Sequence, residues 1–512
     1  MHEADTTVSD DASATSHADS NPRAPWRALI RIGVGVVILA VVVGWPTRHG
    51  EFLQGDDVGL IRDHFLVNHP SWENALRLLT MVHADLYQPL PMLTFMANYA
   101  AGGGDPWGYH VVNVVIHAVN AVLVLLLAWG ISRDVRIAAI TAAMFACHPF
   151  AVEPVAWVTG RILLMASTFA LLVLLLFVFR RPAPGPRWSA GAYALWGLSL
   201  TSKVLPAVPV AAVWCDLNRE PRRDRRWWIT VATLLFMTVA LSGLAYYTTQ
   251  RLAFFRLMAG EATTSLPVRV LLASRYYFQN YVWPTALSAW SPPPVGVSLV
   301  SAGAAIGALS WLAVAALMVW SFRRCRTAFV GLGLFVLLMA PFAVAMTART
   351  FLTADRYMYL PIIGLHLAVA AWAIRGWDAL RLRVPRAASA AMGGAAGLLV
   401  MGFWLSNSFA MAHVFSNTVR QAERAVALHR DDVRAWETLA RAFIQEQQPR
   451  EALNIVAEAR RRWPEDFGLA GEAGEARWML GEYAAAAAEL RAALAGEPHS
   501  AEAEYYLGLS LA

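Results

Sequence analysis

The sequence predicts an all-α protein: a polytopic membrane helical bundle followed by a C-terminal solenoid of helical repeats. Three observations predict this class. Hydrophobic residues make up 57% of the 512 positions and charged residues only 15%, which is typical of membrane proteins. The apolar residues form separate runs, and arginines cluster in the short segments between these runs. After residue 412 the apolar runs stop, and a helical pattern with a period of about 34 residues begins.

These changes in composition divide the chain into three expected parts. Residues 1–25 are acidic, rich in Ser and Thr and poor in large apolar side chains, so we expect a disordered tail. Residues 26–412 form the multipass membrane domain, and residues 413–512 form the repeat domain. No cleavable signal peptide is expected before the first apolar run, which should therefore remain in the protein as an anchor.

Apolar runs near the ~20 residues needed to cross a bilayer predict about eleven spans. The first covers Ala28–Pro46, and the arginines at its start place the N-terminus in the cytoplasm. The other ten are expected to centre near Val124, Ala143, Leu172, Leu195, Val210, Val239, Leu312, Leu334, His366 and Leu399.

This order places all dense arginine clusters on the cytoplasmic side, provided that residues 248–299 stay outside as a loop with a re-entrant or interfacial piece. An odd number of spans then places the repeats on the outer side. The Ala/Arg-rich composition and short loops favour a multi-pass protein of a bacterial cell inner membrane, with periplasmic repeats.

Several function classes have no support in the sequence. The net charge of +6 comes from arginines between apolar runs, so membrane lipids are expected partners and nucleic acid is not. There is no Walker loop, no glycine-rich dinucleotide turn and no His/Cys metal cluster, and we therefore expect no cofactor. Metal dependence stays open, since two adjacent acids could hold a divalent cation, but no metal is predicted because several nearby cations make one unnecessary for charge balance. Cys147, Cys215 and Cys325 lie in or beside apolar runs and are expected to serve packing.

The C-terminal period has the spacing of tetratricopeptide repeats. In the first unit, the characteristic positions of the repeat are occupied by Trp436, Leu439, Ala440, Phe443, Ala452, Ala459 and Pro464. In the second unit, one period later, the matching positions hold Gly474, Ala486, Ala493 and Pro498. Such repeats stack helix pairs into a concave surface. We expect this surface to bind the acceptor or a protein partner, while a purely scaffolding role stays open.

Two adjacent acids, Asp56 and Asp57, follow the first span closely. Clustered carboxylates beside a membrane raise one another's pKa and lose hydration, so they are candidates for a functional site. A carboxylate at this position could act as a general base. The alternative is that one of the two acids caps a short interfacial helix.

Further polar candidates lie in other outer loops. His148, Glu153 and Arg161 occur within one turn between the third and fourth spans, and Glu153 could alternatively only pair with Arg161. Lys203 lies between two short apolar runs, where snorkelling is the ordinary explanation. Arg356 opens the tenth span beside an acid and two tyrosines, a pattern that an aromatic belt also produces.

The second span carries four polar residues on nearly one helical face. Hydrogen bonding between helices is the expected role of this set, and a cavity lining is the alternative. The residues are His110, Asn113, His117 and Asn120.

Together, the outer groups suit one type of reaction. A carboxylate could take the proton of an acceptor hydroxyl, while His148, Arg161, Lys203 and Arg356 could neutralise a departing phosphate. This combination indicates sugar transfer from a polyprenyl-phosphate-linked donor to a protein or glycan acceptor.

The sequence also resembles a known family, the transmembrane and tetratricopeptide repeat-containing O-mannosyltransferases and their bacterial relatives. The resemblance covers most of the membrane part. It is carried by Asp56-Asp57, Tyr87-Gln88-Pro89-Leu90, Tyr109-His110, Asn113, His117, Asn120, His148-Pro149, Glu153, Ala156-Trp157-Val158, Gly160-Arg161, Ser202-Lys203 and Asp355 to Pro361. Two positions depart from the family pattern: Ile162-Leu163-Leu164 follow Arg161, and Val204 follows Lys203, where relatives carry acids.

The resemblance implies a C-type glycosyltransferase fold and an inverting transfer of a mannose-like sugar. Asp56 or Asp57 would be the catalytic base, and Glu153 would orient that base or the acceptor. His148, Arg161, Lys203 and Arg356 would bind the donor phosphate. Two rivals stay open: a polymerase or ligase of diphosphate-linked glycans, and a non-catalytic membrane-anchored scaffold.

Overall fold

The computed structural model describes residues 24–82, 87–180, 185–218, 223–251, 264–288, 291–292, 296–346 and 352–512. Within these ranges the chain is helical and contains no strands, as predicted. The expected N-terminal tail lies outside the described residues, except for its last two positions.

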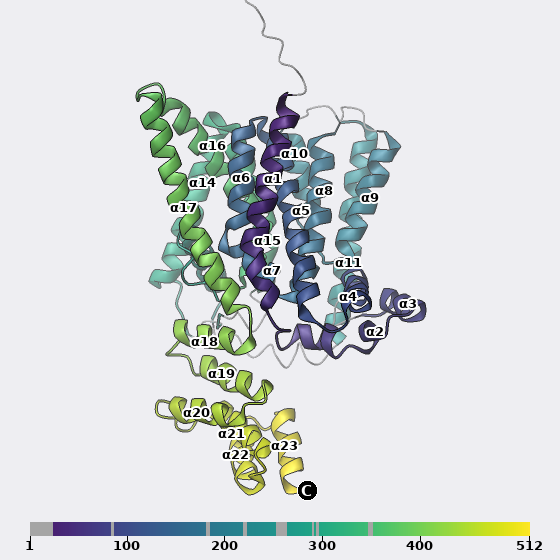
Figure 1. Ribbon diagram of the computed structural model, residues 1–512, viewed down its shortest axis with the longest axis vertical. Helices are drawn as coiled ribbons and strands as arrows, with labels where there is room; N and C mark the ends of the chain where they lie inside the picture. Colours follow the sequence, from purple (N-terminus) through teal and green to yellow (C-terminus); the bar gives the residue numbers. More distant parts are fainter. Residues whose placement is uncertain are drawn as a thin grey trace, which may run out of the picture.

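In the part of the chain that the structure describes, twelve helices build the bundle (Figure 1), and every predicted span centre falls within one of them. Their bounds are α1 (Ala24–Gly44), α5 (Pro106–Ser132), α6 (Val135–Cys147), α8 (Arg161–Val178), α9 (Pro186–Leu200), α10 (Val208–Leu217), α11 (Arg225–Arg251), α13 (Leu266–Val282), α14 (Ala302–Arg324), α15 (Arg326–Met346), α16 (Ile362–Leu380) and α17 (Arg386–Val414).

The predicted number of eleven spans is not confirmed. Among the described residues, six helices are long and apolar enough to cross a membrane, or seven if α6 and the short helices after it, bent by 57°, form one span. Helices α9 and α10 have only 15 and 10 residues, because the polar turn around Ser202 and Lys203 separates them. The protein is nevertheless a multi-pass membrane protein.

The segment expected to be an outer loop holds a helix that the sequence did not predict as a span. Helix α13, of 17 residues, packs beside α14, and its buried Ala273 and Tyr277 join the main core of the bundle. The segment is therefore part of the packed structure, although residues 252–263, 289–290 and 293–295 are not described.

A folded cap connects α1 to α5. It contains η1 (Trp45–His49), η2 (Val58–Arg62), α2 (Phe65–Asn68), α3 (Trp72–Thr80) and α4 (Pro89–Gly102). Buried apolar side chains from the cap, including Leu60, Val67 and Phe95, form a second core with Tyr109 and Val158. Because this core fixes the cap to the bundle, the segment that carries Asp56 and Asp57 is held in an ordered position.

The polar face of α5 joins helices, as predicted. The Asn113 Nδ2 donates to the backbone oxygens of Trp157 and Val158, at 3.0 and 3.1 Å. The Asn120 Nδ2 donates to the Tyr359 hydroxyl at 3.1 Å, and the His117 Nδ1 lies 2.9 Å from the same hydroxyl. These hydrogen bonds satisfy buried polar groups and tie α5 to distant segments.

Segments predicted to be cytoplasmic meet at one end of the bundle, here called the arginine-rich end. Arg136, at the start of α6, pairs with Asp378 near the end of α16 at 2.7 Å. The guanidinium of Arg133 lies 5.6 Å from the ring centroid of Phe179, which follows α8. Arg180 then pairs with Asp216 in α10, also at 2.7 Å. The α1 helix begins at this end (Figure 1).

The C-terminal helices continue from α17 at the opposite end (Figure 1). Their starts at Val433, Phe467 and Ala501 are 34 residues apart, which agrees with the predicted period. The bounds are α18 (Thr418–Leu428), α19 (Val433–Gln445), α20 (Pro449–Ala459), α21 (Phe467–Met479), α22 (Tyr483–Gly496) and α23 (Ala501–Leu511).

Hydrogen bonds attach this helical region to the cap and to the segment after α13. The Glu51 N donates to the Ser416 oxygen at 2.9 Å, and the Gln54 N donates to the Thr418 Oγ1 at 3.1 Å. The Arg424 Nε donates to the Leu287 oxygen at 3.2 Å. The C-terminal helices therefore lie at the end of the bundle that carries Asp56 and Asp57, here called the repeat-bearing end.

Candidate functional site

A sequence of short turns between α6 and α8 places the first group of polar residues. It comprises η3 (Pro149–Ala151), α7 (Val152–Ala156) and η4 (Val158–Gly160). Prolines at 149 and 154 interrupt regular helix, since proline lacks a backbone donor. Gly160 is required because a Cβ there would lie 2.3 Å from the Pro154 oxygen. The turn therefore folds back on itself and holds Glu153 inside the bundle.

Glu153 is 1% exposed and forms a buried ion pair with Arg356, which lies in η5 (Asp355–Met358). Its Oε2 also accepts a hydrogen bond from the Arg356 backbone N at 2.6 Å. The alternative that Glu153 pairs with Arg161 is therefore wrong. Arg356 also lies over the ring of Trp157, with 4.8 Å between the guanidinium carbon and the ring centroid.

Asp355, next to Arg356, lies within the protein and is 1% exposed. Its Oδ1 accepts a hydrogen bond from the Tyr276 hydroxyl of α13 at 2.6 Å. Burial raises the pKa of Asp355 well above its ordinary value, and the nearby charge of Glu153 raises it further. Asp355 is thus bound to Tyr276 and does not pair with its neighbour Arg356 through its side chain.

Lys203 reaches the same region from the turn after α9. Its Nζ lies 5.8 Å from the ring centroid of Tyr357, and its side chain is half-buried. The backbone of this turn is fixed to the cap, since the Leu90 N donates to the Thr201 oxygen at 3.3 Å. Lys203 and Arg356 therefore both lie near one aromatic ring, since the Arg356 guanidinium carbon is 5.2 Å from the Tyr357 ring centroid.

The two adjacent aspartates have different environments. Asp57 is fully buried, and its carboxylate accepts hydrogen bonds from the Leu53 N at 3.0 Å and the Thr159 N at 2.8 Å. Burial raises the pKa of Asp57 to about 7, although both hydrogen bonds lower it. Asp56 is exposed. Asp57 lies at the N-cap position of η2, but its side chain makes no capping hydrogen bond there, so its carboxylate does not fill the alternative role of a helix cap.

Arg161 is completely buried and bound within the protein. Its Nε donates to Asn113 Oδ1 at 3.0 Å, its Nη1 to Asn98 Oδ1 at 2.6 Å, and its Nη2 to the Tyr109 oxygen at 2.8 Å. The Nη1 also donates to the oxygen of Thr94 at 3.3 Å. This network connects α4, α5 and α8. The geometry favours a structural role over the expected contact with a donor phosphate.

His148 lies in another environment from the cations. Its Nδ1 accepts a hydrogen bond from the Phe150 N, and its Nε2 lies 3.2 Å from the Tyr281 oxygen. Its ring packs between Tyr281 and Trp404, with 5.5 and 4.5 Å between ring centroids. The structure therefore does not place His148 with Arg356, and an interior packing position describes it better.

The structure thus brings together three of the seven predicted site residues: Glu153, Lys203 and Arg356. Asp56 lies on the cap, which Asp57 joins to the turn before α8. The structure adds three residues that the sequence analysis did not select as site residues, which are Trp157, Tyr276 and Tyr357. Tyr357 directly follows Arg356, and Trp157 lies between Glu153 and Arg161 in the sequence, which was the available signal. Tyr276 had none, because its segment was expected to be a loop.

Among the described residues, no group of three or more His, Cys, Asp or Glu side chains could hold a metal ion. The charges at this site are one buried carboxylate and two cations, and the cap carries one exposed carboxylate. Such a set can accept a proton and stabilise a phosphate.

Comparison with known proteins gives relatives over part of the chain. No family model matches. The mouse protein O-mannosyl-transferase TMTC2 is 40% identical over 92 residues, 18% of this chain and 11% of the relative. The human protein O-mannosyl-transferase TMTC4 is 30% identical over 170 residues, 29% of this chain and 22% of the relative.

Over these segments the chain is similar to the TMTC O-mannosyl-transferases. This confirms the resemblance predicted from the sequence, although most of the length of each TMTC relative lies outside the match. Two structures of ArnT from Cupriavidus metallidurans, one bound to undecaprenyl phosphate and one in the apo state, align with 90% of this chain and 79% of theirs. Their identities are 14% and 16% and their TM-scores 0.38 and 0.39, so no residue is assigned from them.

Proposed function

We propose that the protein is an integral-membrane glycosyltransferase that moves a mannose-like sugar from a polyprenyl-phosphate donor to a protein or glycan acceptor. The observation that carries this proposal is the fixed position of Arg356, which the buried carboxylate of Glu153 holds beside the turns that contact the cap carrying exposed Asp56. Similarity to the TMTC O-mannosyl-transferases supports the same class of reaction.

In this mechanism, Asp56 accepts the proton of the acceptor hydroxyl. The acceptor oxygen then bonds to the anomeric carbon of the sugar as the bond from that carbon to the donor phosphate breaks, which inverts the configuration. The bond electrons leave with the polyprenyl phosphate, whose charge Arg356 and Lys203 stabilise. No general acid is needed, since a phosphate leaves as an anion.

The other polar residues serve this arrangement indirectly. Asp57 anchors the loop that presents Asp56, because its two hydrogen bonds join residue 53 to residue 159. Arg161 organises the helices behind the site. We therefore assign Asp56 as the base and Glu153 as a positioning residue, and we place Arg161 and His148 outside the phosphate contact.

We further propose that the C-terminal helices are tetratricopeptide repeats that bind the acceptor or a protein partner. The first helix of each pair contributes to a cluster of charged groups: Glu437 and Arg441 from α19, Glu472 and Glu475 from α21, and Glu502 from α23. Glu472 pairs with Arg441 at 2.5 Å, yet its other oxygen, Oε2, is buried and has no partner within the described residues.

This acidic surface would complement a basic acceptor segment. Because the repeats attach beside the cap, an acceptor bound to them would lie at the same end of the bundle as Asp56. We place that end in the periplasm of a cell inner membrane, with the arginine-rich end in the cytoplasm.

The test is transfer of radiolabelled mannose from polyprenyl-phosphate mannose by the purified full chain, beside the variant Asp56→Asn. The expected result is transfer by the wild type and a loss of about 10²–10⁴-fold in the variant, the usual contribution of a general base. The matched control is Asp63→Asn, since Asp63 is an exposed acid in the same cap that pairs only with Arg62 at 3.0 Å.

Full activity of the Asp56→Asn variant would contradict the assignment of the base. If the wild type transferred sugar only from diphosphate-linked donors, the polymerase or ligase alternative would replace the proposal. If it transferred from no donor while still capturing a protein through the repeats, the scaffold alternative would replace it.

A further inference from the structure

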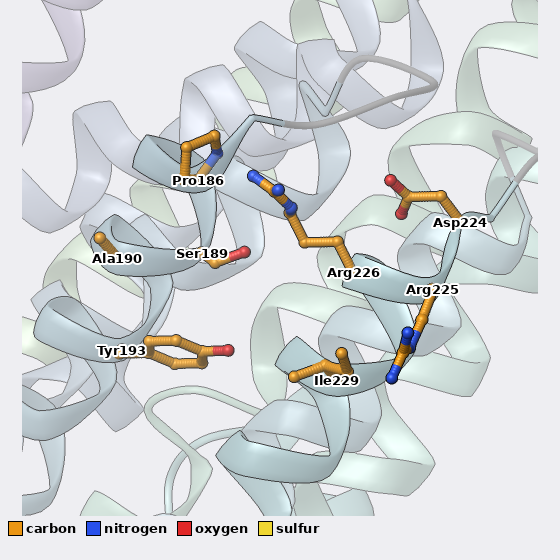
Figure 2. Close-up of a pocket in the computed structure, with 8 residues that line it drawn as sticks. All are labelled: Pro186, Ser189, Ala190, Tyr193, Asp224, Arg225, Arg226 and Ile229. Carbon is orange, nitrogen blue, oxygen red and sulfur yellow. The ribbon is translucent and has the colours of Figure 1, made fainter.

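A groove opens between α9 and α11 at the arginine-rich end of the bundle, with a volume of about 640 Å³. Pro186, Ser189 and Tyr193 line it from α9, and Arg225, Arg226 and Ile229 line it from α11 (Figure 2). The reaction proposed above does not use this groove, because it involves neither these residues nor this end of the bundle.

The polar groups between the two helices are already satisfied. The Thr230 Oγ1 donates to the Ser189 Oγ at 2.9 Å, and the Tyr193 hydroxyl lies 3.5 Å from the same Thr230 Oγ1. Asp224 caps α11, since its Oδ1 accepts a hydrogen bond from the Trp227 N at 2.9 Å. Its carboxylate is therefore engaged at the helix start.

Arg225 and Arg226 differ from the neighbouring charged residues in their ion pairing. Arg223 interacts with Asp216, with 3.6 Å between Nε and the carboxylate. Arg225 and Arg226 are exposed, and in the described part of the chain neither forms an ion pair. Figure 2 shows Arg226 extending toward Ser189 and Pro186, while Arg225 extends along α11 beside Ile229. Two guanidinium groups thus flank one groove.

The position of Arg225 and Arg226 at the start of α11 indicates the class of ligand. An apolar span covers Arg225–Leu244, so the arginines stand at its first residues, at the depth of lipid headgroups. Below them, α11 exposes large apolar side chains, including Trp228 at 61% and Phe236 at 71%. A ligand matching this arrangement carries an anionic phosphate above and acyl chains below.

We propose that this groove binds an anionic phospholipid, with its phosphate between Arg225 and Arg226 and an acyl chain along Tyr193 and Ile229. Guanidinium groups form paired hydrogen bonds with phosphate oxygens, and basic pockets between membrane helices favour anionic headgroups. The groove is separate from the proposed donor site. The 15 residues of α9 separate Pro186 from the turn that carries Lys203, about 22 Å at 1.5 Å per residue.

The experiment uses the full chain in a neutral detergent and counts bound lipids by native mass spectrometry, with phosphatidylglycerol and phosphatidylcholine offered separately. The variant is Arg225→Gln with Arg226→Gln. The control is Arg383→Gln with Arg386→Gln, which removes the same charge from an exposed arginine between α16 and α17 and from the exposed first residue of α17. The affinity of the first variant for phosphatidylglycerol should fall by roughly fivefold for each arginine, while the control keeps wild-type affinity.

Equal binding of both lipids by the wild type would overturn the proposal, as would equal loss in both variants, which would indicate general surface charge. If inorganic phosphate displaced phosphatidylglycerol completely, the groove would be a general anion site in which the acyl chains contribute no affinity. Tighter binding of polyprenyl phosphate than of phosphatidylglycerol, lost in the same variant, would assign the groove to the donor lipid instead. These outcomes can be interpreted even if the protein transfers no sugar, because lipid binding is measured without enzymatic activity.

Discussion

Glu153 holds Arg356 from two sides: its carboxylate pairs with the guanidinium, and the same carboxylate accepts a hydrogen bond from the Arg356 backbone N at 2.6 Å. The two residues are 203 positions apart in the chain. The pair therefore fixes η5 against α7 and holds the Arg356 guanidinium in place. A single buried carboxylate thus sets both the fold and the electrostatics of the site.

Removing either member of this pair should destabilise the protein. Arg356→Met leaves a buried charge on Glu153, which costs about 3–5 kcal/mol of the free energy of unfolding. Combining it with Glu153→Gln removes both charges, so the double variant should recover much of that loss. Denaturation of the detergent-solubilised protein measures these differences.

Activity separates the two roles of Arg356. The double variant should regain stability without regaining sugar transfer, because no cation remains to stabilise the donor phosphate. If transfer returned together with stability, Arg356 would be purely structural and the proposed phosphate contact would be wrong.

Asp57 should make stability depend on pH. Its pKa is about 7 in the folded protein and near 3.8 when unfolded, so between these values the folded state keeps a proton that the unfolded state has lost. Stability should therefore fall as pH rises from 4 to 7, by roughly 4 kcal/mol at 1.36 kcal/mol per pKa unit. The thermal midpoints at pH 4 and pH 7 measure this difference.

The variant Asp57→Asn has no carboxyl to titrate, so its midpoint should change less over the same range. The comparison is between the two pH slopes, which allows for any constant loss caused by the amide. Parallel slopes in the two proteins would mean that Asp57 does not carry the effect.

Arg161→Lys should lower stability strongly although it keeps the positive charge. A lysine has one point donor group, whereas Arg161 donates to Asn113, Asn98 and Tyr109 in different directions. Each buried acceptor left unsatisfied costs about 1–3 kcal/mol. The matched control is Arg62→Lys, whose ion pair with Asp63 is 47% and 60% exposed and should contribute less than about 1 kcal/mol.

The Michaelis constant for the donor distinguishes this role from phosphate binding. A structural Arg161 predicts a lower thermal midpoint with a Michaelis constant close to wild type in the folded fraction. A large rise in that constant at unchanged stability would restore Arg161 to the donor site.

Gly364→Ala should disrupt the packing of α15 against α16. A Cβ at Gly364 would lie 2.4 Å from the Gly331 oxygen and 2.5 Å from the Phe335 N, both backbone atoms that cannot rotate away. Overpacking of this kind costs about 1–3 kcal/mol. Gly376→Ala on the same helix is the control, since a Cβ there meets no atom within 4 Å. Equal thermal midpoints for the two variants would show that the helices can separate at little cost.

Particular residues show how far the sequence could predict the site. The four polar positions of α5 share a face because of helical spacing alone, and their role in joining helices followed from that face. Asp56 and Asp57, being adjacent, were indistinguishable by spacing. Only the position of the Thr159 N, about a hundred residues later, made Asp57 buried and left Asp56 exposed.

The sequence by itself determined the all-helical class, the apolar helices and the 34-residue period, because hydrophobic patterning and helix-breaking residues act over a few turns of chain. The tertiary structure alone decided that Glu153 pairs with Arg356 and not Arg161, that His148 packs among aromatic rings, and that α13 joins the bundle. These outcomes depend on which segments, far apart in the sequence, pack against one another. The spacing of residues within one segment does not indicate its packing partner.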